Sequence, residues 1–223
     1  TSLLALARRE NARLIYLANP DNPMGSWWPA DAIASLIADV PEGSLLLLDE
    51  AYGEFSPPGT LPPLDTSNPR VLRFRTFSKA YGMAGLRVGY AIGHAEVIRA
   101  FDKVRNHFGI SRIGQAAAIA ALAGQQHLET VLRKTAEAKA AIATIATGCG
   151  LLPLPSATNF VTIDCGGSEQ AKAILNGLLA RGIFARMPGI APLNRCIRIT
   201  AGSPADLEHF GKALAALAHQ TGG

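Results

Sequence analysis

Lys79 stands in an unusual setting for a lysine. It follows Thr76 and Ser78 in the stretch TFSK, and the residues after it, up to Arg87, are mainly glycine, alanine, leucine and aromatic residues. Lysine is scarce in this chain, with six lysines against fifteen arginines. Because a surface lysine usually has polar neighbours, this setting indicates that Lys79 is used for its amine nitrogen. Such an amine can form a Schiff base with an aldehyde.

Two other polar clusters accompany this one along the chain. The three clusters are NPDNPMG at 19–25, DEAYGEF at 49–55 and TFSK at 76–79. The first two directly follow short apolar runs, and the third directly follows the strand expected at 70–75. Taken singly, each has an ordinary structural explanation, since Asn-Pro pairs make turns and acidic residues end strands or cap helices. Taken together they indicate a ligand site, because ligands of open α/β sheets bind just beyond the carboxyl ends of the strands.

The clusters supply chemical groups that complement one another. A carboxylate can keep a heterocyclic nitrogen protonated and so make the ring an electron sink. A phenol and a carboxamide can hydrogen-bond a ring hydroxyl, and two hydroxyls beside an arginine can hold a phosphate. This inventory matches pyridoxal 5′-phosphate, with Arg87 and the hydroxyls on the phosphate and Lys79 on the aldehyde carbon.

The elements that must position these groups alternate between strands and helices. Short apolar runs ending in polar residues are typical of strands buried in a parallel sheet, and apolar residues at helical spacing predict helices. The strands expected before residue 120 are 13–18, 44–48, 70–75 and 87–92, and the helices are 29–39, 95–105 and 111–123.

The pattern changes after residue 120. A stretch rich in alanine and glutamate predicts one long helix at 126–147, and helices follow near 168–181 and 204–218. Strands are expected at 159–164, 183–186 and 195–199. We therefore expect an α/β cofactor-type domain at 1–120 and a smaller α/β domain at 121–223.

Composition limits the possible classes of protein. The chain has 223 residues, of which 48% are hydrophobic and 17% charged, so a sizeable core is expected and disorder is not. The net charge of +4 comes with scattered arginines, which does not favour nucleic-acid binding. The three cysteines and five histidines lack metal-ligand spacing and predict no metal site. Free cysteines fit a reducing, cytoplasmic compartment, and no apolar run is long enough to span a membrane.

The motifs resemble those of fold-type I aminotransferases of class I/II, and they are most similar to the histidinol-phosphate aminotransferase family. NPDNPMG is similar to that family's Asn-Pro-x-Asn-Pro-Thr-Gly, with Met24 in place of the threonine. LLLLDEAYGEF and TFSKAYGMAGLRVGY match its next two blocks, and CIRIT followed by AG resembles its C-terminal block. The resemblance implies a transferase fold with a mainly parallel sheet in the large domain, followed by a smaller C-terminal α/β domain.

The resemblance also implies a role for each matching residue at the cofactor. The implied cofactor-binding residues are Asn22, Asp49, Tyr52, Thr76, Ser78, Lys79 and Arg87. Lys79 would form the Schiff base and shuttle a proton, while Asp49 would pair with the pyridine nitrogen. Tyr52 and Asn22 would contact the ring hydroxyl, and the remaining three would bind the phosphate.

Three further residues are implied to bind the substrate. Arg198 would clamp the α-carboxylate, for which its planar fork suits two parallel hydrogen bonds. Arg186 would bind a substrate phosphate, although an arginine at a strand end can equally be a surface residue. Asn159 matches an asparagine that the family places near the substrate carboxylate.

The implied activity is transfer of an amino group between an amino acid and a keto acceptor in a homodimeric enzyme. Histidinol phosphate with imidazole acetol phosphate, or an aromatic amino acid, would be the substrate. A decarboxylase acting on an amino-acid phosphate shares the same lysine, aspartate and arginine, and a non-catalytic remnant is a further alternative. Family members carry additional residues before the block that begins at Thr1, so we expect this chain to correspond to the C-terminal part, with the N-terminal part absent.

Overall fold

A computed structural model describes residues 2–218, and the chain divides into two compact units. Unit 1 joins the residues up to Pro20 with Trp27–Glu129, and unit 2 joins Asp21–Ser26 with the residues from Thr130 onward. This division lies after the predicted boundary at residue 120, because α4 and the first residues of α5 belong to unit 1. The assignment of domains to 1–120 and 121–223 stays a prediction.

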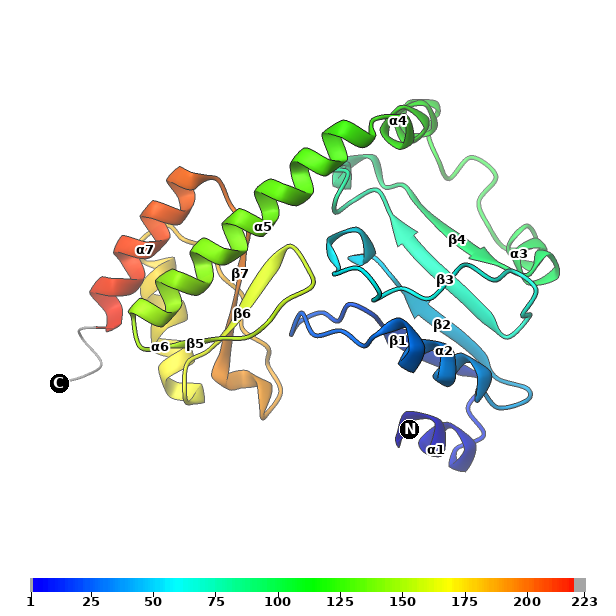
Figure 1. Ribbon diagram of the computed structural model, residues 1–223, viewed down its shortest axis with the longest axis horizontal. Coiled ribbons are helices and arrows are strands. Elements are labelled where there is room, and N and C mark those ends of the chain that lie inside the picture. Colours follow the sequence, from blue (N-terminus) through cyan, green and yellow to red (C-terminus); the bar gives the residue numbers. More distant parts are fainter. Residues whose placement is uncertain (1, 219–223) are drawn as a thin grey trace. The chain divides into compact units, whose positions relative to one another are not determined.

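Unit 1 is built on a four-stranded sheet with the order β1-β2-β3-β4 (Figure 1). The strands are β1 (Leu14–Ala18), β2 (Leu45–Asp49), β3 (Val71–Thr76) and β4 (Gly89–Gly93). The first three pair in parallel, and β4 pairs antiparallel with β3. The parallel pair β1–β2 is connected through a helix, as a crossover requires, whereas β3 and β4 are joined by a short segment. The sheet is mainly parallel, as predicted.

Helices cover one face of this sheet. The helices of unit 1 are α1 (Ser2–Arg9), α2 (Ala30–Ala38), α3 (Ala95–Phe101) and α4 (Arg112–Ala123), with 3-10 turns η1 (Gly53–Phe55) and η2 (Ala84–Leu86). Leu4 of α1 and Ile33 of α2 pack in one buried cluster with Leu46 and Leu48 of β2, and both helices lie beside β1 and β2 in Figure 1. Alternation along β1 turns Leu14 and Tyr16 to the opposite face, where they are exposed.

A buried ion pair joins the ends of β2 and β3. Glu50 follows β2 and is fully buried. Its Oε1 accepts a hydrogen bond from Nε of Arg73 at 2.9 Å, and its Oε2 accepts one from Nε of Arg75 at 3.0 Å. Arg73 also donates to the carbonyls of Pro62 and Pro63, so the proline-rich loop is fixed to the same pair. Both carboxylate oxygens of Glu50 are therefore hydrogen-bonded, as burial of a charge demands.

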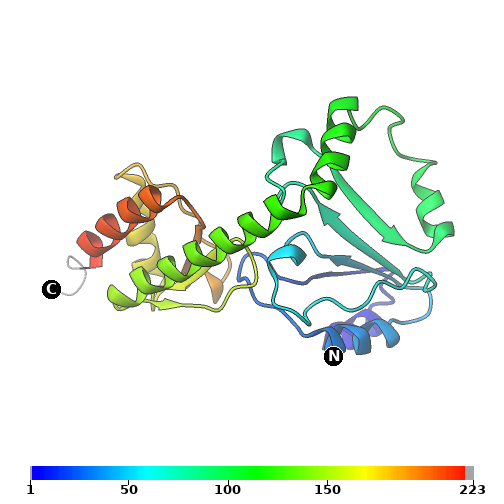
Figure 2. The same ribbon diagram turned by 45° about the horizontal axis from the view of Figure 1, so that its top comes forward.

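Unit 2 packs helices against a three-stranded antiparallel sheet, ordered β5-β6-β7. Its strands are β5 (Leu152–Pro153), β6 (Phe160–Asp164) and β7 (Cys196–Thr200), and its helices are α5 (Gln125–Gly148), α6 (Ser168–Leu179) and α7 (Pro204–Ala218), with a 3-10 turn η3 (Leu193–Arg195). Figure 2 shows the three helices gathered beside this sheet. Ile142 of α5, Ile174 of α6 and Leu214 of α7 share one buried cluster with Ile163 and Ile197 of the sheet.

Two predicted elements differ from the structure. The predicted strand 183–186 is wrong, because only Arg186 pairs, in an isolated bridge to Arg198. Pro188 and Pro192 follow closely and lack the N–H groups that would extend a ladder. The helix predicted at 95–105 ends at Phe101. Within the described residues, no helix is both long and apolar enough to cross a membrane.

We predict that Glu50→Ala strongly destabilises unit 1. Removing one partner of a buried ion pair leaves an uncompensated charge, which typically costs about 3–5 kcal/mol. Urea unfolding followed by tryptophan fluorescence reports on this unit, because both tryptophans, Trp27 and Trp28, lie in it.

The matched control is Asp102→Ala, which breaks an exposed pair with Arg105 in the same unit. Exposed pairs contribute little, so the control should change the free energy of unfolding by no more than about 0.5 kcal/mol. Equal effects of the two substitutions would show that the Glu50 pair does not stabilise the unit.

Candidate functional site

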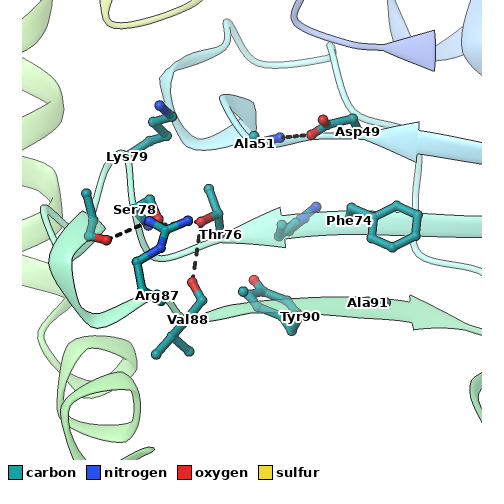
Figure 3. A pocket seen from close by; sticks show the side chains of 13 residues that line it. Asp49, Ala51, Phe74, Thr76, Ser78, Lys79, Arg87, Val88, Tyr90 and Ala91 are labelled. Atoms are coloured by element: carbon teal, nitrogen blue, oxygen red, sulfur yellow. Dashed lines mark hydrogen bonds between the residues drawn. The ribbon is translucent and has the colours of Figure 1, made fainter. Parts of the chain in front are cut away.

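A cavity of about 610 Å³ opens in unit 1 beyond the carboxyl ends of β2 and β3. Asp49, Thr76, Ser78, Lys79 and Arg87 all line it, and Figure 3 shows their side chains around it. The sheet register explains why they meet. Asp49 is paired with Phe74, so Asp49 and Thr76 emerge on the same face of adjacent strands. Five of the seven predicted cofactor-binding residues therefore line one cavity.

One part of the cavity wall is suited to an anion. Thr76, Ser78 and Arg87 come together in Figure 3, and the Thr76 hydroxyl accepts a hydrogen bond from the Ser78 N–H at 3.0 Å. Arg87 adopts the left-handed conformation with φ of 55°, which costs a non-glycine residue about 1–2 kcal/mol. Its Nη1 donates to the Ala84 carbonyl at 2.7 Å. Backbone strain at a residue lining a cavity is typical of a functional position.

Lys79 lies close to Tyr52. Its Nζ is 5.3 Å from the centroid of the Tyr52 ring, which is within the range of a cation–π contact. Tyr52 immediately precedes η1 and is 7% exposed, so packing fixes its ring. The structure thus brings the predicted amine and the predicted phenol together in unit 1.

Asp49 is held by two hydrogen-bond donors. Its Oδ1 accepts from the Ala51 N–H at 3.0 Å, and its Oδ2 accepts from the Tyr16 hydroxyl at 2.7 Å. The sequence motifs did not point to Tyr16. Tyr16 lies two residues before Ala18, which pairs with Asp49, so it is on the same face of the sheet, but this pairing leaves no local signal in the sequence.

Charges behind the cavity wall are set by Glu50. Burial alone would lower the pKa of Arg75, but the charge of Glu50 and its hydrogen bond outweigh burial and raise that pKa. Burial raises the pKa of Glu54, and repulsion from Glu50 adds to the effect. Both effects favour the protonated form of Glu54 more than water would.

A second group of predicted residues gathers in unit 2. Arg198 on β7 donates from Nη1 to Oδ1 of Asn22, and its guanidinium carbon lies 4.8 Å from the centroid of the Phe160 ring. Its Nε is buried and has no hydrogen-bond partner among the described residues. A buried donor without a partner is uncommon in proteins and is typical of a site that accepts a ligand.

The loop that carries Asn22 is fixed to unit 2. The Thr162 hydroxyl donates to the Pro23 carbonyl at 2.7 Å, and the Ala157 N–H donates to the Gly25 carbonyl at 2.9 Å. Gly25 has φ of +80°, and a Cβ there would lie 2.5 Å from Oγ of Ser156, so only glycine fits. Asn22 therefore accompanies Arg198 in unit 2, while the other predicted cofactor residues belong to unit 1.

Arg186 and Asn159 lie near Arg198 in the same unit. The backbones of Arg186 and Arg198 pair in an antiparallel bridge, so the two side chains start on the same face. Like charges directly opposite each other are unfavourable unless an anion is bound between them. The carbonyl of Asn159 accepts from the Ala201 N–H at 2.9 Å, which fixes this residue beside β6.

Comparison with known proteins gives a consistent family. The curated histidinol-phosphate aminotransferase 2 of Ralstonia nicotianae is 39% identical over 207 residues, covering 90% of this chain and 55% of that protein. A crystal structure of histidinol-phosphate aminotransferase from Sinorhizobium meliloti, in complex with pyridoxal-5′-phosphate, matches with a TM-score of 0.96 and 53% identity. That match covers 98% of this chain and 60% of the other.

A more distant likeness concerns the fold alone. The L-threonine-O-3-phosphate decarboxylase of Porphyromonas gingivalis matches with a TM-score of 0.78 at 23% identity, over 94% of this chain and 65% of that one. The chain spans little more than half the length of the curated relative from Ralstonia. The sequence model for aminotransferase class I and II matches residues 1–214, and the chain belongs to this family.

Proposed function

We propose that this chain carries the cofactor-binding lysine and the substrate-binding arginines of a pyridoxal-phosphate-dependent aminotransferase. The observation that carries the proposal is the cavity that Lys79 lines together with Asp49 and the Thr76, Ser78 and Arg87 group. An amine, a carboxylate and an anion-binding group meet there, and the cofactor carries an aldehyde, a basic ring nitrogen and a phosphate that complement them. The Sinorhizobium relative supports the same cofactor, because its structure is a complex with it.

Each cavity residue has a task that its surroundings suit. The Lys79 Nζ would bind the aldehyde carbon and later carry a proton to or from the substrate carbon. The Thr76 and Ser78 hydroxyls and the Arg87 guanidinium would hold the phosphate by charge-assisted hydrogen bonds. When bound, the cofactor supplies an electron sink for the carbon next to the amino group.

Three residues would bind the polar groups of the ring, one at the pyridine nitrogen and two at the ring hydroxyl. The Asp49 carboxylate would accept the hydrogen of the pyridine nitrogen and stabilise its positive charge. The Tyr52 phenol and the Asn22 amide would both hydrogen-bond the ring hydroxyl. Asn22 can do so with its amide N–H₂, because its Oδ1 accepts from Arg198.

The residues of unit 2 would bind the anionic groups of the substrates. Arg198 has a buried Nε without a partner among the described residues, and a carboxylate would satisfy it. Arg186, which pairs with it through the backbone, would bind a substrate phosphate, and Asn159 would help to orient the carboxylate. The names of the relatives support histidinol phosphate as a substrate, and the family resemblance adds imidazole acetol phosphate as its keto counterpart. The α-carboxylate of an aromatic amino acid would bind to Arg198 in the same way.

The setting of the enzyme is part of the proposal. The described cysteines are free, which fits a cytoplasmic protein. A homodimer is proposed on the family resemblance. Decarboxylation of an amino-acid phosphate would use the same residues and is the alternative activity. Release of carbon dioxide from the substrate would indicate decarboxylation and not transamination.

Lys79→Ala is expected to abolish covalent attachment of pyridoxal phosphate while leaving the fold intact. The 223-residue chain is incubated with the cofactor, reduced with borohydride and digested, and the modified peptide is found by mass spectrometry. The wild type should carry the modification on Lys79, and Lys103→Ala, which removes an exposed lysine of the same unit, should behave like the wild type. Attachment that persists at another lysine in Lys79→Ala would overturn the proposed function.

Asp49→Asn is expected to slow the reaction with an amino-acid donor by a factor of roughly 100 or more, since a neutral amide stabilises the protonated ring poorly. The donor reaction is followed by the change in cofactor absorbance after rapid mixing. Asp39→Asn, which lies just after α2 in the same unit, serves as the control and should react at the wild-type rate. An unchanged rate in Asp49→Asn with cofactor bound would remove Asp49 from the site.

Arg198→Lys is expected to weaken binding of the amino-acid donor by roughly 10- to 100-fold, because lysine keeps the charge but loses the two parallel hydrogen bonds. Attachment of the cofactor should be unaffected. The dissociation constant of the donor is measured from the concentration dependence of the same absorbance change. A wild-type dissociation constant would assign Arg198 a structural role through Asn22 and Phe160 instead.

A further inference from the structure

We propose that Tyr16 is a positioning residue that fixes the carboxylate of Asp49 against the pyridine nitrogen of the cofactor. The inference rests on the proposed function, because it concerns the same cavity. It adds a residue from β1, which none of the sequence motifs includes and which does not itself line the cavity.

The first step is the geometry between β1 and β2. Tyr16 is paired with Leu47, and Ala18 is paired with Asp49, so Tyr16 and Asp49 are diagonal neighbours on one face of the sheet. Such neighbours are within reach of a long side chain. Tyr16 extends across this diagonal, and its hydroxyl donates to Oδ2 of Asp49 at 2.7 Å.

The second step is that two hydrogen bonds restrain the orientation of the Asp49 carboxylate. The Ala51 N–H donates to one carboxylate oxygen, and the Tyr16 hydroxyl donates to the other. A carboxylate has about four lone-pair positions, so these two donors still leave an acceptor for a ring N–H. Without Tyr16, only the backbone donor of Ala51 would orient the carboxylate.

The third step concerns the location of a proton. A hydrogen bond donated to a carboxylate stabilises its ionised form. In an N–H···O pair with the pyridine ring, this favours a proton on the ring nitrogen over a proton on Asp49. A protonated ring is the better electron sink. The Tyr16 hydroxyl on β1 would therefore influence the chemistry at Lys79 through Asp49.

Tyr16 is largely exposed in this structure. Its side chain is 60% exposed, and Leu14, two residues earlier on the same face, is 62% exposed. The two positions therefore share strand, face and exposure, and they differ in that the Tyr16 hydroxyl bonds Asp49. Leu14 supplies a matched control for any effect of altering this face of β1.

The experiment compares Tyr16→Phe, Leu14→Ala and Asp49→Asn with the wild type, each as the 223-residue chain loaded with pyridoxal 5′-phosphate. The readout is the pH midpoint at which the visible absorbance of the cofactor on Lys79 changes, together with the melting temperature. We expect Tyr16→Phe to have the melting temperature of the wild type. We expect it to shift the pH midpoint of the cofactor on Lys79 upward by about half a pH unit or more. A less protonated ring withdraws fewer electrons from the nitrogen that joins it to Lys79, so that nitrogen keeps its proton to higher pH. Asp49→Asn should shift the midpoint further in the same direction, and Leu14→Ala should not shift it.

The other possible results would overturn either the role of Tyr16 or the proposed function. An unshifted midpoint in Tyr16→Phe, with the cofactor attached to Lys79, would overturn the role of Tyr16 and leave the proposed function standing. An equal shift in Leu14→Ala would also overturn it, because the effect would then come from the strand and not from the hydroxyl. Failure of the wild type to form a borohydride-stable adduct on Lys79 would overturn the proposed function, and the role of Tyr16 with it.

Discussion

The buried carboxylate of Glu50 holds together the two strand ends on which the cavity is built. Glu50 bonds Arg73 and Arg75 on one face of the sheet, while its neighbour Asp49 points to the other face, as alternation along an extended chain requires. The pair thereby fixes the register that sets Asp49 beside Phe74 and places Thr76 on the cavity face. A slip of one residue between these strands would turn the cavity groups to the opposite face.

The second unit arranges its groups by a different principle. Its short antiparallel strands place Thr162 directly opposite Arg198, with Arg186 on the other side of Arg198. The Thr162 hydroxyl holds the Asn-Pro loop through the Pro23 carbonyl, and the loop presents Asn22 to Arg198. A loop that leaves and rejoins unit 1 along the chain is thus a structural part of unit 2.

Much of this arrangement was predictable from the sequence, because strands and site motifs leave local signals. The apolar runs before Asn19 and Asp49 and the strand expected at 70–75 mark parallel strands, and the polar clusters after them give the cofactor residues. Contacts that depend on register leave no such signal. The bond from Tyr16 to Asp49, the burial of Glu50 and the attachment of the Asn-Pro loop to unit 2 all join residues distant in the sequence. The single bridge at Arg186 likewise depends on β7, not on local propensity.

We expect one cavity of unit 1 to bind pyridoxal phosphate through Lys79. A crystal structure of the chain grown with the cofactor tests this most directly. We expect electron density continuous with Nζ of Lys79, with the phosphate against Thr76, Ser78 and Arg87 and the ring nitrogen beside Asp49. Density for the cofactor on another lysine, or a phosphate turned away from Arg87, would contradict it.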